Sequence, residues 1–446
     1  MNSVLQKIFS SVIRTGTLTV TTASGRKFML GDGSGKPIAV RFTSLAAELG
    51  MLFNPELKVG ESYMNGTFVI DEGSMVDVLA LALAQEGAGK VPHWTRPQSL
   101  IRQLNQGLRQ LVGGSQRQAG VLDRLDLEQF YSYFLDDDMQ LSCAYFEAPD
   151  QSLEEAQLAK NRHIAAKLLI KPGNLVLDIG SGWGALAFFL AEVYDARVHG
   201  VTLSPEHVAS ARARATSRGL DASVMFDLQD YRNVVGTFDR LVAIELAENV
   251  GVGQFEAFFR KCGNLVKVDG VILLQLSGRP ERMEISNPFI SKYLFPGVYL
   301  PTLSELLPAI EGAGLVLADV EILRGHYTAT IKVWRERFRA HRDEIERRYG
   351  GSFYRMWDFW FACSEVSVEH AAVYQLQLAK RHDVVPITHD YIAREEARLR
   401  GLELERSSAP AALNTSNEGT AGFRLSKTLE PQRTINDIIG PTPFMK

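Results

Sequence analysis

The feature that most constrains the fold is a regular alternation of apolar strands and amphipathic helices between residues 165 and 335. The segments expected to be strands are 174–180, 197–203, 223–230, 238–246, 270–278 and 315–323. The segments expected to be helices lie between them, at 184–194, 205–219, 254–266 and 303–314. Strands that alternate with helices in this way build a parallel sheet with helices on both faces. The sequence therefore predicts an α/β fold with a doubly wound sheet.

A glycine-rich turn, VLDIGSGWGAL at residues 176–186, joins the first of these strands to its helix. Gly180, Gly182 and Gly184 let the backbone turn tightly and approach a ligand, and the helix that follows offers unpaired N–H groups. A dinucleotide site prefers G-x-G-x-x-G with an acidic residue about 20 residues later. Here the spacing is G-x-G-x-G, and the acidic residue, Asp178, comes before the loop. This arrangement suits a ligand without phosphates, whose ammonium and sulfonium are positive, and it resembles the first motif of Rossmann-like S-adenosylmethionine methyltransferases.

The ends of the next two strands supply further candidate cofactor contacts. Thr202 or Ser204, after the second strand, is placed to face a ribose. Gln229 and Asp230, after the third strand, are placed to meet an adenine ring and its exocyclic amine. Taken alone, an aspartate such as Asp230 is more often a turn or helix cap. Its position in the alternating series favours the binding role.

The rest of the chain divides by composition and periodicity. We expect an N-terminal α+β domain at 1–101, a linker rich in Gln, Arg and Gly at 102–121, a catalytic domain at 122–405 and a disordered tail at 406–446. Within these, 17–33 is expected to be a hairpin, 74–85 a helix and 332–405 entirely helical.

The first segment, MNSVLQKIFSSVIRTG, has an apolar stripe of helical periodicity. A helix packed on its own domain is the favoured interpretation, and an interfacial helix that touches lipid is the alternative. The same stripe would also serve a homodimer.

Charge and cysteine content exclude other classes of protein. The net charge of −4 gives no support to a nucleic-acid partner. Cys143, Cys262 and Cys363 are far apart and odd in number, which fits a reducing cytoplasm and no metal cluster. No apolar run reaches the roughly 20 residues that span a bilayer, and no cleavable signal segment is expected.

Several longer strings are similar to the cyclopropane-fatty-acyl-phospholipid synthase family, over most of residues 1–400. The most specific are SCAYF at 142–146 followed by LEEAQ at 153–157, and further matches are NPELKVGESYMNGTFVIDEGS, LDIGSGWGALAFFLAE, VTLSPEH, DYRNVVGTFDR, KYLFPGVYLP and ILRGHYTATIKVW. The resemblance implies transfer of the methyl of S-adenosylmethionine to the double bond of an acyl chain in a membrane phospholipid. A carbocation forms, and loss of a methyl proton, with bound bicarbonate as the base, closes a cyclopropane ring.

The resemblance also assigns residues to the reaction. The family's bicarbonate ligands correspond here to Cys143, Glu248 and Tyr327, and Gln275 stands where the family has a histidine. Cys143 is expected to be a packed wall residue, because methyl transfer to an alkene needs no thiolate. Glu245, three residues before Glu248, is expected to belong to the strand end.

Elementary chemistry requires a similar set of groups. An alkene is a weak nucleophile, so the sulfonium must be close and oriented. A cationic intermediate needs a dry pocket with a negative or π-rich wall and an acceptor for one proton. Glu248 and Tyr327 fit this description. The aromatic residues Tyr293, Phe295 and Tyr299 fit it too, although most aromatics are core residues.

The departures from the family pattern leave the product open. Asn249 replaces a histidine after the glutamate, and Gln275 cannot carry a positive charge. Leu246 and Ala247 replace a bulky Met-Phe pair, and in 124–131, which the family closes over its cofactor, only the final Phe-Tyr matches.

The alternatives to a cyclopropane synthase are a methyltransferase that gives a methyl-branched chain, a paralogue acting in furan fatty acid formation, a small-molecule methyltransferase and a lipid-binding subunit without activity. The favoured prediction is a cytoplasmic enzyme, peripheral on the inner face of the membrane, that binds S-adenosylmethionine and holds no metal.

Overall fold

The computed structural model describes residues 2–85, 127–280, 287–367 and 372–408. The predicted linker at 102–121 and nearly all of the predicted tail at 406–446 lie outside these residues. The domain boundaries at residues 101 and 122 therefore stay predictions.

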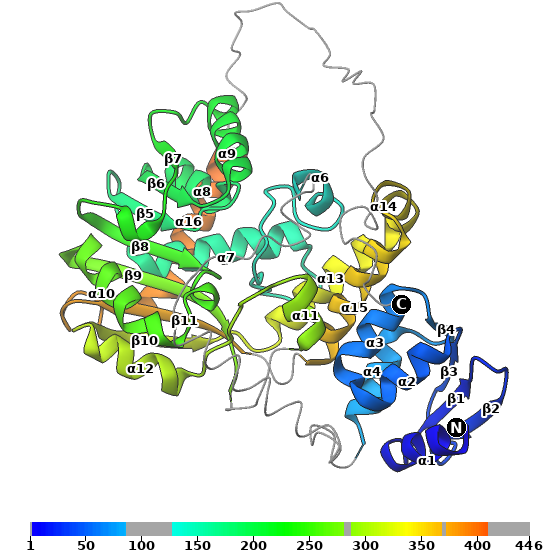
Figure 1. Cartoon of the computed structure of the whole chain (residues 1–446). Coiled ribbons are helices and arrows are strands. Elements are labelled where there is room, and N and C mark those ends of the chain that lie inside the picture. Colours follow the sequence, from blue (N-terminus) through cyan, green and yellow to red (C-terminus); the bar gives the residue numbers. More distant parts are fainter. Residues whose placement is uncertain (1, 86–126, 281–286, 368–371, 409–446) are drawn as a thin grey trace, which may run out of the picture.

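The N-terminal part is a four-stranded sheet with helices, as expected for an α+β domain (Figure 1). The strand order is β2-β1-β3-β4. The elements are α1 (Asn2–Val12), β1 (Thr17–Thr21), β2 (Lys27–Leu30), β3 (Pro37–Phe42), α2 (Leu45–Phe53), α3 (Pro55–Met64), β4 (Phe68–Glu72) and α4 (Met75–Leu83). Strands β1 and β2 pair antiparallel, which confirms the predicted hairpin, and α4 confirms the predicted helix at 74–85.

A seven-stranded sheet forms the centre of the second part, in the order β10-β11-β9-β8-β5-β6-β7. Its strands are β5 (Leu175–Ile179), β6 (Arg197–Thr202), β7 (Val224–Leu228), β8 (Phe238–Ile244), β9 (Val266–Gly278), β10 (Val316–Ile322) and β11 (Ala372–Ala379). Strands β5 to β9 pair parallel with one another, in the order β9-β8-β5-β6-β7. The predicted α/β class with a Rossmann-like sheet is confirmed.

Helices cover both faces of this sheet because successive strand residues point to opposite sides. One core contains Leu241 and Ala243 of β8 together with α10 (Phe255–Leu265) and α12 (Leu303–Gly312). The other contains Val242. The helices of that second core are α7 (Leu153–Leu168), α8 (Ala185–Tyr194), α9 (Pro205–Arg218) and α16 (Asp390–Ser408).

Strand β11 is a difference from the sequence prediction, which made all of residues 332–405 helical. It pairs antiparallel with β9 on one side and with β10 on the other. Its polar residues Gln375 and Gln377 are fully buried. Buried glutamines within a strand interrupt the apolar pattern that marks an interior strand, so the prediction was wrong here.

The C-terminal helices α13 (His326–Ala340), α14 (Arg342–Tyr349) and α15 (Gly351–Ser367) form an aromatic core with α6 (Leu127–Tyr131). Phe130 of α6 lies against Phe353 and Trp357 of α15, with ring centroids 4.9 and 4.8 Å away. Helix α15 also contacts the N-terminal part, where the hydroxyl of Tyr63 donates to Asp358 at 2.7 Å. Helix α15 of the aromatic cluster therefore makes one of the contacts that join the two parts.

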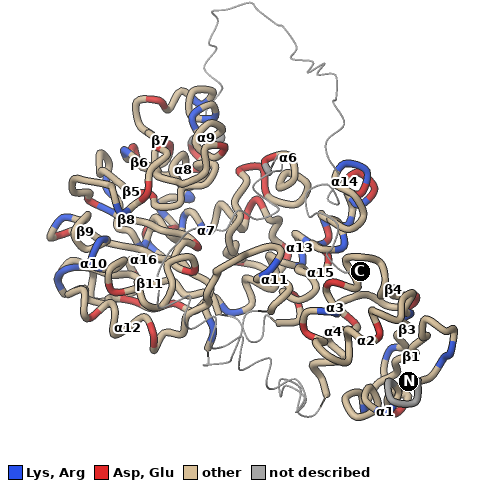
Figure 2. The backbone as a smooth tube through the Cα atoms, viewed as in Figure 1, with Lys and Arg blue, Asp and Glu red and all other residues tan. Residues whose placement is uncertain are grey.

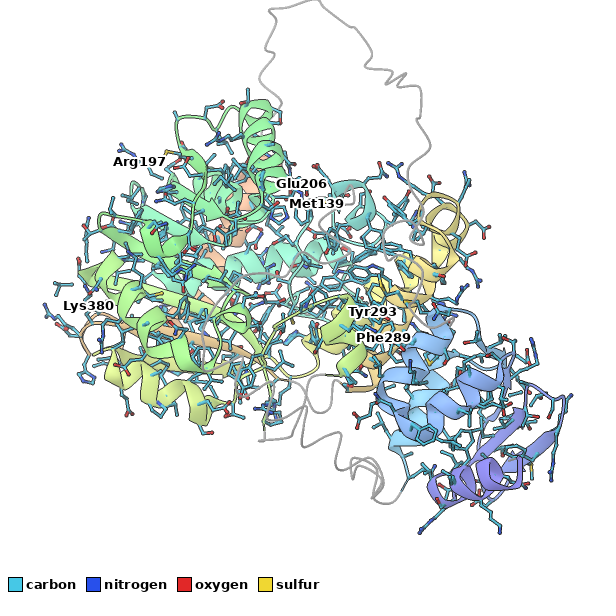
Figure 3. The ribbon with its side chains drawn as sticks, viewed as in Figure 1. Met139, Arg197, Glu206, Phe289, Tyr293 and Lys380 are labelled. Atoms are coloured by element: carbon cyan, nitrogen blue, oxygen red, sulfur yellow. The ribbon has the colours of Figure 1, made fainter. Side chains whose placement is uncertain are left out.

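Helix α11 (Pro288–Tyr293) makes a second contact with α3 of the N-terminal part. Figure 3 shows Phe289 and Tyr293 on this helix, and the Tyr293 hydroxyl donates to Glu61 at 2.9 Å. A Cβ on Gly60 would lie 2.5 Å from the Phe289 ring, so only glycine allows this approach.

Charged residues of both signs are interspersed over the sheet-containing part in Figure 2. Among the described residues, no helix is both long and apolar enough to cross a membrane.

Candidate active site

The candidate site residues gather where the parallel strands end. In such sheets ligands bind outside the carboxyl ends of the strands. Backbone hydrogen bonds tie these ends together: the N–H of Gly180 donates to Val201 at 2.8 Å, and the N–H of Gln229 donates to Thr202 at 3.0 Å. Strands β5, β6 and β7 therefore present the predicted cofactor residues along one edge.

The glycine loop has the conformation that its sequence predicts. Gly180, Gly182 and Gly184 have φ angles of 81°, 52° and 90°, which favour glycine. A Cβ on Gly184 would lie 2.8 Å from the rings of Phe188 and Phe226. A Cβ on Gly182 would have no atom within 4 Å among the described residues. The loop thus packs tightly on one side and is open on the other.

Polar groups of the loop fit an S-adenosylmethionine site. Helix α8 begins at Ala185, directly after Gly184, and so turns its unpaired N–H groups toward the loop. The hydroxyl oxygen of Ser181 is buried and has no hydrogen-bond partner among the described residues. Such an orphaned group at the end of strand β5 is available to a bound molecule.

Asp178 is the last residue but one of strand β5 and is 3 % exposed. Burial raises the pKa of its carboxyl to about 7, and the charge of Lys160 opposes this shift. Lys160, from α7, is also 3 % exposed and donates to the Ser142 hydroxyl at 2.7 Å. Burial lowers the pKa of Lys160 to about 8, while the charges of Asp136, Glu245 and Asp178 act against it. Lys160 was not predicted as a site residue, because helix α7 is rich in polar residues and its burial is evident only in the structure.

Thr202 and Gln229 lie at adjacent strand ends, as predicted. The Asp230 carboxylate accepts hydrogen bonds from the backbone N–H and the side chain of Arg232, both at 2.9 Å. It caps a short 3₁₀ helix, Tyr231–Asn233. The capping role that the sequence analysis weighed is present, and adenine recognition by Asp230 stays a prediction.

Glu248 lies in a 3₁₀ turn, Ala247–Asn249, beyond the end of β8 and is 5 % exposed. Its Oε1 accepts a hydrogen bond from the backbone N–H of Ser277 at 2.5 Å. Its Oε2 is buried without a hydrogen-bond partner among the described residues. Burial, and then the negative charge of Glu245, raise the pKa of the Glu248 carboxyl to about 8. This carboxyl is therefore buried, and one of its two oxygens lacks a hydrogen bond within the described residues.

Glu245 is a site residue that the sequence analysis assigned only to a strand end. It directly follows β8 and has a left-handed φ of 51°. Its Oε1 accepts a hydrogen bond from the backbone N–H of Cys143 at 2.8 Å. Burial raises the pKa of its carboxyl, whereas the hydrogen bond from Cys143 and the charge of Lys160 lower it. The spacing of two acids after an apolar strand was the only signal in the sequence.

Gln275 and Cys143 are both fully buried beside these carboxyls. The Gln275 amide nitrogen donates to the Cys143 carbonyl at 3.3 Å, and its amide oxygen accepts from Gln375 of β11 at 3.0 Å. The carbonyl of Gln275 accepts the backbone N–H of Glu245 at 2.7 Å. Burial raises the pKa of the Cys143 thiol well above its usual range, which agrees with the expected wall residue rather than a nucleophile.

Tyr327 lies in the first turn of α13 and packs against the cluster that contains Cys143. Burial, and then the negative charges of Glu245, Cys143 and Glu248, raise the pKa of its hydroxyl well above the usual range. The structure thus brings together all four residues predicted to be catalytic, and adds Glu245 and Lys160.

The three aromatic residues predicted to line the cation pocket lie in different surroundings. Tyr293 is bonded to Glu61, and Phe295 packs against Trp360 with ring centroids 5.6 Å apart. Tyr299 is tied to the backbone of Glu248, because its N–H donates to the Glu248 carbonyl at 2.9 Å. Asn249 is exposed.

The short helix α6 reaches the glycine loop through one aromatic pair. The ring of Tyr131 lies 5.6 Å from that of Trp183, and Trp183 lies 4.2 Å from His207 of α9. Segment 124–131 was expected to close over the cofactor. Of its two residues that match the family, Tyr131 contacts the glycine loop.

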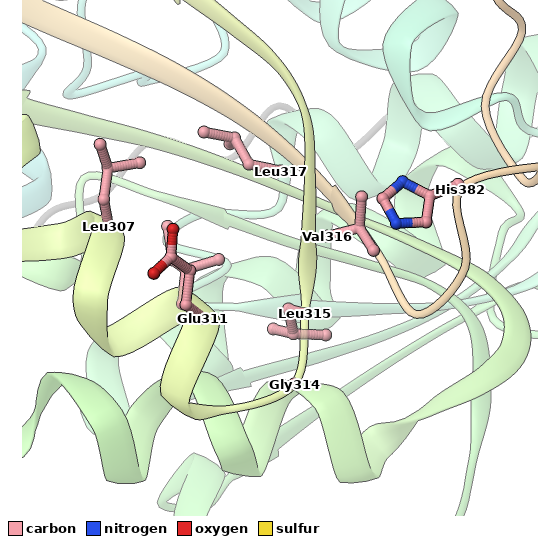
Figure 4. Close-up of a pocket in the computed structure, with 8 residues that line it drawn as sticks. Leu307, Glu311, Gly314, Leu315, Val316, Leu317 and His382 are labelled. Atoms are coloured by element: carbon pink, nitrogen blue, oxygen red, sulfur yellow. The ribbon is translucent and has the colours of Figure 1, made fainter.

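A pocket of about 480 Å³ lies elsewhere, between α12 and the start of β10 (Figure 4). Its lining includes Leu307, Glu311 and His382. The pocket adjoins the amino end of β10. It therefore lies at the opposite edge of the sheet from the carboxyls of Glu245 and Glu248.

Comparisons with known proteins agree with this geometry. The sequence model of a family described as "Mycolic acid cyclopropane synthetase" matches residues 117–378. The cyclopropane-fatty-acyl-phospholipid synthase of Escherichia coli (strain K12) is 35% identical over 312 residues, which are 69% of this chain and 78% of that protein. A tuberculostearic acid methyltransferase of Mycobacterium tuberculosis is 31% identical over 337 residues, which are 72% and 78% of the two chains.

A crystal structure of a mycolic acid cyclopropane synthase complexed with SAH and CTAB is similar in fold. Its TM-score is 0.53 at 28% identity, over 56% of this chain and 93% of that chain.

Proposed function

Because this chain belongs to the mycolic acid cyclopropane synthetase family, we propose that it is an S-adenosylmethionine-dependent enzyme that alkylates the double bond of a phospholipid acyl chain and forms a cyclopropane ring. The observation that carries the proposal is the position of the secluded Glu248 carboxyl beyond the strand adjacent to the glycine loop. Within the described part of the chain, its Oε2 and the buried Ser181 hydroxyl have no hydrogen-bond partner, and these two groups mark the two ends of one site.

The cofactor end is formed by Asp178, the glycine loop, Thr202 and Gln229. S-adenosylmethionine supplies an electrophilic methyl group when it is bound there. The relative solved with SAH, the form that remains after methyl transfer, supports this assignment. The carboxyl of Asp178 suits an ammonium group. Its pKa is about 7, and a positive charge beside it favours the ionised carboxylate.

The reaction end is formed by Glu248, Glu245, Tyr327 and Cys143. An alkene that gains a methyl cation becomes a carbocation, and negative or π-rich groups in a dry pocket stabilise that charge. The two carboxyls and the Tyr327 ring supply such a wall. A proton acceptor is also needed, and the family resemblance assigns that role to bicarbonate.

A methyl-branched acyl chain is a second candidate product. The observation in its favour is Gln275, whose amide is bonded to Cys143 and Gln375 and cannot hold a positive charge beside an anion. Two relatives carry names that differ in this respect, cyclopropane synthase and tuberculostearic acid methyltransferase.

We further propose that the protein acts in the cytoplasm, at the inner face of the membrane, as a peripheral protein. The substrate class and the apolar stripe of the N-terminal helix support this placement. Sedimentation with phospholipid vesicles tests it: a protein that stays in the supernatant with anionic and with neutral vesicles contradicts it. The homodimer stays a prediction, which the mass in solution will test.

Lipid mass spectrometry with methionine deuterated in its methyl group tests the reaction. Cells that express the protein are compared with cells that lack it. A cyclopropane ring retains two deuterium atoms from each methyl group, because ring closure removes one, whereas a methyl branch retains three. Expression of the Glu248→Gln variant is the matched control. If no acyl chain acquires label in a protein-dependent manner, the proposed function is wrong.

A further inference from the structure

Two donors that could hold a small anion between Cys143, Glu248 and Tyr327, the Cys143 N–H and the Gln275 amide, are already engaged. The backbone N–H of Cys143 donates to Glu245 at 2.8 Å. The amide of Gln275 donates to the Cys143 carbonyl at 3.3 Å. The side chain of Gln275 further accepts from Gln375. The Cys143 N–H is therefore directed to a carboxylate of the chain itself, and the Gln275 amide is directed to a backbone carbonyl.

Bicarbonate does not fit such a pocket. A second anion would lie against the Glu245 carboxylate, and like charges in a buried site disfavour each other. Gln275, at the place where the family has a histidine, cannot offset that repulsion with a positive charge. The residues present thus disagree with the bicarbonate that the family resemblance implies.

The backbone of Glu245 holds its side chain in this position. A φ of 51° is uncommon for glutamate and is a strained backbone conformation. The conformation is fixed by the hydrogen bond from the Glu245 N–H to the Gln275 carbonyl, at 2.7 Å. Without this turn the strand would run on and carry the side chain away from Cys143.

We propose that the Glu245 carboxylate is the resident anion of this pocket and accepts the proton that the substrate cation loses. The inference rests on the proposed function. In the step, a C–H bond of the cation breaks, and its electron pair closes the new carbon–carbon bond. The proton goes to a Glu245 carboxylate oxygen, which gives a neutral carboxylic acid.

The charged and titratable groups around Glu245 come from four elements. Lys160 faces it from α7, Cys143 from the segment before α7, Glu248 from the turn after β8, and Tyr327 from α13. Lys160 is the one positive charge among these four, and it opposes the effect of burial on the pKa of Glu245. A carboxylate between one ammonium and a second carboxyl can take up a proton at little cost.

The alternative is that Glu245 only fastens the Cys143 segment to the sheet. Two variants separate the roles. Glu245→Gly removes the carboxylate and suits the left-handed backbone, and Glu245→Asn keeps a polar side chain that tolerates this conformation. Thermal denaturation shows whether each variant folds.

The expected results are specific for an internal base. Wild-type turnover on unsaturated phospholipid vesicles does not change when dissolved bicarbonate is removed. Turnover of both variants falls by about 100-fold or more, as for loss of a proton acceptor. Formate or bicarbonate partly restores Glu245→Gly, because the small anion can enter the vacated space. Glu256→Gln, on an exposed residue of α10, is the matched control and retains wild-type turnover.

A binding measurement gives a readout that does not depend on turnover. The NMR line width of ¹³C-labelled bicarbonate should be unaffected by the wild-type protein and broadened by Glu245→Gly. Broadening by the wild type, bicarbonate-dependent wild-type turnover, near-normal turnover of Glu245→Asn, or failure of both anions to restore Glu245→Gly would each overturn the proposal. A wild-type protein without any lipid product contradicts the proposed function instead, and the NMR comparison still tests the anion.

Discussion

The carboxylate of Glu245 and the backbone N–H of Cys143 are joined by a hydrogen bond of 2.8 Å, although 102 residues separate them in the sequence. The bond fastens the segment before α7 to the end of β8. It brings the residues of the SCAYF string to the carboxyl edge of the sheet, beside Glu248. The site is therefore assembled by long-range contacts rather than by one local motif.

The first prediction concerns Glu248. Glu248→Gln should lower the rate of methyl transfer by about 100-fold or more, because the wall of the cation pocket loses a carboxylate. The free energy of unfolding at pH 8 should stay the same or rise, since the variant removes a charge that burial disfavours. Turnover on vesicles and urea denaturation measure the two effects. A variant with near-normal turnover would remove Glu248 from the reaction.

The second prediction is a pH dependence of stability. The pKa of Glu248 is raised to about 8, while in the unfolded chain it lies at about 4.3. Between these values the folded protein binds more protons than the unfolded chain, so the free energy of unfolding falls as pH rises from about 5 to about 8. Denaturation midpoints of the cofactor-free protein should show this fall, and a weaker one in Glu248→Gln. Equal slopes for both proteins would contradict the prediction.

The third prediction contrasts two glycines. Gly184→Ala should destabilise the protein by about 1–3 kcal/mol, because its Cβ would meet two phenylalanine rings and φ is 90°. It should also weaken cofactor binding. Gly219→Ala, at the end of α9, has φ of 68° but no clash among the described residues, and should cost about 1 kcal/mol. Unchanged cofactor affinity in Gly184→Ala would count against the loop as the binding site.

The fourth prediction concerns Lys160 as a positioning residue. Its charge lowers the pKa of Asp178, which burial raises to about 7. Lys160→Met should therefore leave less of Asp178 ionised at pH 7 and weaken S-adenosylmethionine binding there, with recovery at higher pH. Lys160→Arg keeps the charge and should retain more of the affinity. Calorimetric titration at several pH values measures this, and a pH-independent loss in Lys160→Met would indicate a purely structural role.

The sequence predicted the glycine loop and the fold class because both depend on local patterns. Three glycines between an apolar strand and a helix determine the turn with little help from other segments. Glu245 could not be placed in this way, since its left-handed φ depends on Gln275 and its hydrogen bond on Cys143. The side chain of a residue after a strand can point either way until the neighbouring strand is known.

Strand β11 shows the same limit at the level of the sheet. Its two buried glutamines resemble a solvent-facing pattern, but Gln375 bonds Gln275 and Gln377 bonds Tyr391. Polar side chains that bond to each other inside a core cannot be distinguished by periodicity from those that face water.

The position of β11 in the chain also determines when the enzyme can become active during synthesis. The strand follows α15 in sequence but lies between β9 and β10 in the sheet. Until the ribosome has released residue 379, β9 is an edge strand, β10 lacks the strand that joins it to the sheet, and Gln275 is without Gln375. Shorter nascent chains already contain the complete glycine loop, so the capacity to bind cofactor can precede the finished reaction pocket, which is completed by one of the last strands to leave the ribosome.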